Sequence, residues 1–284
     1  MILVMGATGT IGSEVVRQLA ARGEKVRALS RDPAKARVPA GAETAVGHHR
    51  DRASVEAAMA GAEAAFLVGV FGPDDAEHDR GLAAAAKAAG VRRIVKLSAI
   101  GTGDPRLGVF GTWHLHGEEA ARASGLEWTL LRPSAFASNT LSWVPAVREG
   151  TPASNMMGTG RQGVVDPRDV AETAAAALLD PRHAGRTYTL TGPETLSAHE
   201  QAAVLADVLG RPVPLHDLSP QERRTQLLAA GLDENYADGL MVTARFIHEG
   251  GNDVVTGDVQ EALGRPARTY RQWAEDHEPA FARG

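Results

Sequence analysis

The chain of 284 residues contains no cysteine. Disulfides, thiol catalysis and thiolate metal sites are therefore excluded together, and the groups left for chemistry are Ser, Thr, Tyr, His, Lys and the carboxylates. Aromatic residues make up only 5% of the chain. We predict no metal site, because His114 and His116 are two residues apart on an expected helix and diverge, and the separate pair His48 and His49 lacks an obvious third ligand.

Clusters of basic residues and long apolar runs are also absent. The formal net charge is −5 and no basic run occurs, so we expect neither nucleic acid nor an anionic membrane surface as a partner. No apolar stretch approaches the ~20 residues of a membrane span. No leader pattern precedes the first apolar segment, and we therefore expect a cytoplasmic protein.

The first twelve residues carry the strongest positive signal. An apolar segment, Ile2 to Met5, runs directly into three glycines at three-residue spacing, Gly6, Gly9 and Gly12. Glycine permits a sharp strand-to-helix turn and the close approach of a pyrophosphate, which the N–H groups at the helix start can hold. The alternative is an ordinary glycine turn, but apolar residues at helical spacing follow and favour a nucleotide site. The cofactor-binding residues expected from this segment are Gly6, Thr8, Gly9, Thr10, Ile11 and Gly12.

Strand and helix patterns then alternate along the first half of the chain. The expected helices cover 77–89 and 114–124, and the expected strands cover 25–31, 43–47, 64–70, 93–99 and 126–131. Such alternation implies right-handed crossovers and a parallel sheet. We therefore predict an α/β fold with a doubly wound parallel sheet of the Rossmann type, with Gly69 and Val70 at the end of the fourth strand as further cofactor contacts.

Regular alternation breaks up after Pro133. Residues 164–179 and 188–190 return to the pattern of the first half. Two Ser-x-x-Glu sequences, beginning at Ser197 and Ser219, predict helix starts in a mostly helical C-terminal third. We predict a nucleotide-binding domain of residues 1–133 plus about 160–192, and a smaller substrate-binding region of about 134–159 plus 193–284.

Ser30 and Arg31 end the second expected strand, where a site for NAD usually has an acidic residue. A guanidinium can pair with a 2′-phosphate, which a carboxylate would repel. We therefore predict NADP(H) as the cofactor. The alternative is that Arg31 is a solvated residue at a strand end.

Taken together, these motifs resemble the NmrA-like branch of the atypical short-chain dehydrogenase/reductases, which includes quinone oxidoreductases, triphenylmethane reductases and redox-sensing regulators. The resemblance covers nearly the whole chain and implies NADP(H) bound across the carboxyl ends of the strands, under a C-terminal region that closes a substrate cleft. One departure is Gly47-His-His-Arg-Asp51, where relatives usually have Gly-Asp. The motifs that carry the resemblance are Gly6-Ala-Thr-Gly-Thr-Ile-Gly12, Ser30-Arg31, Lys96-Leu-Ser-Ala-Ile-Gly101, Gly125-Leu-Glu-Trp-Thr-Leu-Leu-Arg-Pro133 and Asp166-Pro-Arg-Asp-Val-Ala171.

The usual proton donor of short-chain reductases, a Tyr with a Lys four residues later, is missing. Tyr188, Tyr236 and Tyr270 are followed at that spacing by Gly, Leu and Ala. Its place is taken by His114-Leu-His-Gly-Glu118, which resembles a His-x-x-x-Glu motif of some NmrA-like quinone reductases.

The spacing of four puts His114 and Glu118 on one helix face, where the carboxylate could orient the imidazole and raise its pKa. The alternative is an ordinary exposed ion pair. Ser98 stands where relatives have the catalytic serine and could bind a substrate carbonyl, or it is a turn residue at a strand end. Ser98, His114 and Glu118 are the candidate catalytic residues.

Hydride transfer without a dedicated acid favours a substrate that stabilises its own oxyanion, such as a quinone or an aromatic ketone. Apolar residues in the segments expected to face the cleft suit a flat apolar molecule, although each one could simply be core. They are Phe71, Phe110, Trp113, Phe136, Trp143 and Met156, with Met157 beside them.

The leading hypothesis is an NADPH-dependent oxidoreductase of a bulky aromatic carbonyl compound, a quinone or polyketide-type ketone, working as a monomer or homodimer. The alternative is a non-catalytic NADP(H)-binding redox sensor, which the missing Tyr-Lys pair favours. An epimerase or dehydratase is a weaker third reading, since those enzymes generally need the same pair.

Overall fold

The computed structural model describes residues 1–32, 38–69 and 76–282. Its centre is a seven-stranded sheet in which every neighbouring pair is parallel, in the order β3-β2-β1-β4-β5-β6-β8. The strands are β1 (Ile2–Val4), β2 (Val26–Ser30), β3 (Ala42–Val46), β4 (Ala64–Leu67), β5 (Arg93–Leu97), β6 (Glu127–Pro133) and β8 (Arg186–Leu190). The strand order reverses between β1 and β4, and ligands of such sheets bind at the carboxyl ends of the strands beside that point.

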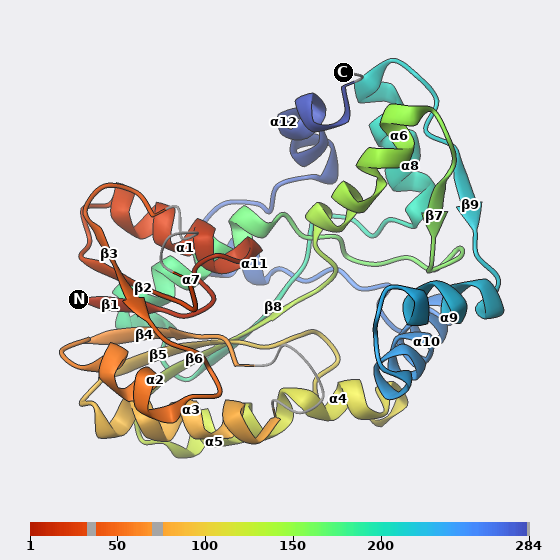
Figure 1. Ribbon diagram of the computed structural model, residues 1–284. Coiled ribbons are helices and arrows are strands. Elements are labelled where there is room, and N and C mark those ends of the chain that lie inside the picture. The colour runs from red at the N-terminus through yellow and green to blue at the C-terminus, as the bar shows by residue number, and fades with distance from the viewer. Residues whose placement is uncertain (33–37, 70–75, 283–284) are drawn as a thin grey trace.

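Helices cover both faces of this sheet (Figure 1). On one face α1 (Thr10–Ala21), α7 (Pro167–Leu179) and α11 (Asp258–Leu263) share an apolar core with Ile2 and Val4. On the other face α2 (Arg52–Met59), α3 (Ala76–Ala88) and α5 (Leu115–Ala123) pack with Leu3 and Met5. Alternate residues of β1 therefore enter opposite cores, which explains why the strand is apolar throughout. The predicted doubly wound fold is confirmed.

A third core lies in the C-terminal region, at the top of Figure 1. It joins Trp143, Leu205 and Trp273 with other apolar residues of η3 (Ala137–Trp143), α6 (Val144–Glu149), α8 (Ala198–Leu209) and α12 (Tyr270–Phe281). Beside it β7 (Ala153–Asn155) pairs in parallel with β9 (Leu215–Asp217). The sequence showed no period between 134 and 159 because each element there is too short to repeat one.

A second helical group lies at the right of Figure 1, formed by α9 (Pro220–Ala229) and α10 (Glu234–His248). The short elements η2 (Pro105–Leu107) and α4 (Val109–Trp113) contact α10, and η4 (Pro181–His183) leads into β8. Both predicted capping boxes are present, with Ser197 starting α8 and Ser219 starting α9.

The predicted division into two units remains a prediction. In space, α11 packs against α7 and β8, so this part of the C-terminal segment lies with the nucleotide-binding half. Among the described residues, no helix is both long enough and apolar enough to cross a membrane.

Candidate active site

The glycine-rich turn after β1 has the geometry of a phosphate site. Gly6 has a φ of +62°, which side-chain-bearing residues rarely adopt, and the Gly9 N–H donates to the Gly6 carbonyl at 2.9 Å. A Cβ on Gly12 would lie 2.2 Å from the Gly6 oxygen, so only glycine lets α1 begin this close to the turn. Ile11 is buried in the core, which leaves its backbone rather than its side chain for a ligand. The start of α1 thus presents N–H groups where an anion can bind.

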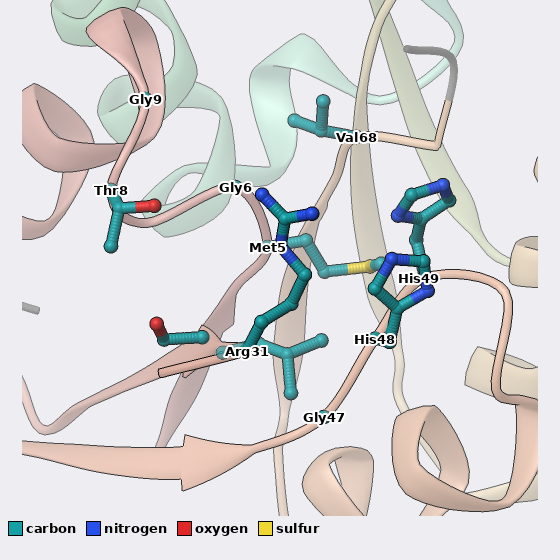
Figure 2. A pocket seen from close by; sticks show the side chains of 11 residues that line it. Met5, Gly6, Thr8, Gly9, Arg31, Gly47, His48, His49 and Val68 are labelled. Atoms are coloured by element: carbon teal, nitrogen blue, oxygen red, sulfur yellow. The ribbon is translucent and has the colours of Figure 1, made fainter. Parts of the chain in front are cut away.

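A cavity of about 290 Å³ opens beside this turn. Figure 2 shows Arg31 crossing it from the end of β2 towards Gly6, with His48 and His49 on the other side. The two imidazole rings lie 4.2 Å apart between centroids. No acidic side chain lies among the described residues of the lining. This suits a 2′-phosphate, which a carboxylate would repel. The lining residues are Met5, Gly6, Thr8, Gly9, Leu29, Ser30, Arg31, Gly47, His48, His49 and Val68.

Not every predicted cofactor residue lines this cavity. Thr10, Ile11 and Gly12 form the first turn of α1 instead. Gly69 instead packs closely against α3, where a Cβ at position 69 would lie 2.7 Å from the Asp79 carboxylate. Val70, together with the predicted substrate residue Phe71, lies outside the described residues.

A second cavity, of about 430 Å³, adjoins the first at Val68, which lines both. We call it the head cavity. Its wall is mostly apolar. On one side the rings of Phe110 and Trp113 of α4 lie 3.9 Å apart between centroids, and they pack against Tyr236 of α10 at 5.6 and 5.4 Å. The wall comprises Val68, Leu97, Ser98, Ala99, Ile100, Leu107, Phe110, Trp113, His114, Pro133, Ser134, Ala135, Phe136, Asn139, Met157, Gln162, Thr243, Phe246, Ile247 and Asn252.

Ser98 lines the head cavity just after β5, and the fully buried Glu118 stands behind it. The Ser98 hydroxyl donates to the Glu118 carboxylate at 2.6 Å, and Arg132 donates to both carboxylate oxygens at 2.8 and 2.6 Å. Burial by itself raises the pKa of Glu118, but hydrogen bonds from Arg132 and Ser98 and the charges of Arg132 and Arg122 outweigh it and lower that pKa. Glu118 is therefore an anion that holds Ser98 in a fixed orientation.

His114 also lines the head cavity, between the end of α4 and the start of α5. Burial lowers the pKa of His114 to about 3, the Lys96 charge adds to this, and Glu118 opposes it without prevailing. Glu118 does act to raise the pKa of His114, but the expected net increase is wrong, because burial and the positive charges of Lys96 and Arg132 outweigh it. The imidazole is uncharged at neutral pH, and its buried Nδ1 has no hydrogen-bond partner among the described residues.

Sequence reasoning missed a buried ion pair beneath this site. The Lys96 ammonium donates to the Asp79 carboxylate at 2.9 Å, and both side chains are almost fully buried. A Cβ on Gly117 would lie 1.8 Å from that carboxylate, so glycine lets α5 pack over the pair. The available signal was Lys96 inside the expected strand 93–99, where Ile94, Val95 and Leu97 are apolar.

Sequence reasoning also missed a set of neutral polar groups on the wall of the head cavity. The Asn252 amide donates to Ser134 Oγ and to Gln162 Oε1, each at 3.2 Å. These residues come from three distant segments, and no local pattern marks them. The cavity therefore offers amides and hydroxyls, without a charged side chain among its described residues.

The predicted substrate residues divide between two cavities. Phe110, Trp113 and Phe136 line the head cavity. Trp143 and Met156 line a third cavity of about 470 Å³, to which Phe136 also contributes. Trp143 belongs at the same time to the C-terminal core.

The fold and the site define a nicotinamide dinucleotide-binding α/β protein. The family model described as NAD(P)H-binding matches residues 6–181. The chain belongs to this family, and the expected resemblance to NmrA-like atypical short-chain dehydrogenase/reductases is confirmed, as is the expected nicotinamide cofactor.

Two curated relatives match nearly the whole chain. The (4-alkanoyl-5-oxo-2,5-dihydrofuran-3-yl)methyl phosphate reductase of Streptomyces griseus is 42% identical, over 99% of both chains. The NAD(P)H azoreductase of Xenophilus azovorans is 35% identical, again over 99% of both.

Among solved structures, the NADPH-dependent quinone oxidoreductase of Escherichia coli complexed with NADPH has a TM-score of 0.83 at 28% identity, covering 97% of this chain and 99% of that one. The Citrobacter triphenylmethane reductase complexed with NADP(H) shares the fold, with a TM-score of 0.82 at 23% identity over 98% and 99% of the two chains. These named relatives are all oxidoreductases.

Proposed function

We propose that this protein is an NADPH-dependent oxidoreductase that reduces a carbonyl group of a bulky, flat, conjugated molecule, a quinone or a polyketide-type aromatic ketone. The observation that carries the proposal is the junction at Val68, where a cavity suited to the cofactor meets an apolar cavity lined by Ser98 and His114. The reductase activities for which the Streptomyces, Xenophilus and Escherichia relatives are named support it.

When bound, NADPH supplies a hydride with two electrons, which the carbonyl carbon accepts while its oxygen takes up one proton. The uncharged His114 can donate a hydrogen bond to that oxygen, but it is no imidazolium acid at neutral pH. The Ser98 proton points to Glu118, so Ser98 accepts a hydrogen bond from the substrate, such as that of a phenolic hydroxyl. Both features favour a substrate that stabilises its own oxyanion, and quinones and hydroxylated aromatic ketones do so.

The test is the loss of NADPH absorbance when the purified protein is mixed with a panel of quinones and hydroxylated polycyclic ketones, with NADH run in parallel. We expect turnover with NADPH and weaker turnover with NADH. Tight NADPH binding without turnover of any panel member would overturn the proposal and favour a redox sensor.

We further propose that the protein works in the cytoplasm as a monomer or homodimer, with a small molecule rather than nucleic acid or a membrane as its partner. The net charge of −5 and the absence of a basic run in the sequence support the expectation that neither nucleic acid nor a membrane is a partner.

A further inference from the structure

The third cavity, of about 470 Å³, adjoins the head cavity. We call it the tail cavity. Five residues line both: Ala135, Phe136, Asn139, Met157 and Gln162. From this boundary the tail cavity extends between η3, α6, β7 and the start of α8. Each of the two cavities falls within the range of about 300–1,000 Å³ typical of small-molecule sites.

The polar groups of the tail cavity are largely bonded to the protein itself. The Asn155 amide donates to the Gly158 carbonyl at 2.8 Å and to Asp217 at 2.7 Å, and its oxygen accepts from the Met157 N–H. Thr140 donates to Gln201 and accepts from Tyr270. These groups have hydrogen-bond partners within the protein, so a ligand in the tail cavity does not need polar groups to satisfy them.

The remaining lining of the tail cavity is apolar and adaptable. Phe136, Trp143, Met156 and Met157 supply rings and flexible thioethers, which accommodate chains of varying shape. No Asp, Glu, Lys or Arg occurs among the described residues that line either cavity. An ionised group would lose its hydration there without gaining a partner.

We propose that the two cavities form one substrate site, in which the head cavity holds the carbonyl-bearing ring beside Ser98 and His114 and the tail cavity holds an uncharged alkyl or acyl chain. The inference rests on the proposed function and specifies its substrate class as elongated and neutral. It also predicts that a phosphate-bearing compound, such as the substrate named for the Streptomyces relative, is a poor substrate.

The experiment uses naphthoquinones whose alkyl side chain grows from methyl to octyl. Burial of each methylene raises kcat/KM by about threefold to fourfold until the tail cavity is filled. Two variants narrow that cavity alone, Ala146→Phe on α6 and Ser154→Phe on β7. Ala57→Phe, on the exposed side of α2, is the matched control.

We expect the two cavity variants to lose the dependence on chain length while they reduce the methyl compound as well as the wild type does. The Ala57→Phe variant should keep the dependence. A wild-type kcat/KM independent of chain length, or an unchanged dependence in both cavity variants, would overturn the inference.

Failure of the proposed function gives a different result, namely no turnover even of the methyl compound. In that case calorimetric titration of the same series into the NADP⁺-loaded protein still measures the dependence of Kd on chain length. A Kd that does not fall as the chain grows would then refute the tail cavity.

Discussion

His114 makes the protein less stable in mild acid, and substituting it should remove that effect. Burial and the nearby Lys96 charge lower the pKa of His114 to about 3 in the folded protein. In the unfolded chain the same group titrates at about 6.5. Between these values the unfolded state binds more protons than the folded state, so the free energy of unfolding falls as the pH is lowered through this window.

The size of the effect follows from the two pKa values. Well inside the window the free energy of unfolding changes by about 1.4 kcal/mol per pH unit for one proton. Between pH 7 and pH 5 the contribution of His114 amounts to about 2 kcal/mol. His114→Gln keeps a polar side chain of similar size but cannot bind this proton. From pH 7 to pH 5, the free energy of unfolding of the variant should therefore fall by about 2 kcal/mol less than that of the wild type.

The measurement is urea unfolding of the wild type and His114→Gln at a series of pH values from 7 to 5, with the difference between the two plotted against pH. The other titrating groups occur in both proteins, so their contributions cancel in the difference between the two free energies of unfolding. The exposed His116 on α5 gives the control, because His116→Gln removes an imidazole that stays in contact with water in the folded protein. Wild type and His114→Gln curves that run parallel across the interval would refute the uncharged state of the partly buried His114.

Four further substitutions test the cofactor site and the contact between Ser98 and Glu118. Arg31→Asp should weaken NADPH binding by about ten- to a hundredfold and NADH binding much less, since a charged hydrogen bond to the 2′-phosphate is worth about 1.5–3 kcal/mol; equal losses in a binding titration would contradict this role. Gly12→Ala should weaken NADPH binding and lower stability by about 1–3 kcal/mol, because its Cβ would lie 2.2 Å from a carbonyl oxygen; unchanged thermal unfolding would argue against it. Glu118→Gln should cost about 3 kcal/mol of stability by leaving Arg132 without its anion. Ser98→Ala should cost only about 1 kcal/mol of stability but lower kcat, and denaturant unfolding combined with steady-state kinetics separates the two variants.

Much of the nucleotide-binding half was predictable because its signals are local. The apolar run of β1, the glycines at positions 6, 9 and 12 and the apolar face of α1 all follow from backbone sterics and helical periodicity within about 20 residues. The capping boxes at Ser197 and Ser219 act over three residues, and both helices begin where these motifs predict. The short elements η3, α6 and β7 offered no such period, so the sequence indicated apolar substrate residues such as Trp143 and Met156 but not that they line a separate cavity.

The partners in the active site were decided by the tertiary structure. The spacing of four residues suggested that Glu118 serves His114, but the fold brings Arg132 from β6 and Ser98 from the end of β5 to that carboxylate. Sequence alone determined which residue types are present and where strands and helices run, since these depend on short-range sterics and hydrogen bonds. Burial and charge depend on groups far apart in the chain, so only the folded structure decided that Glu118 is held as an anion and that His114 stays neutral.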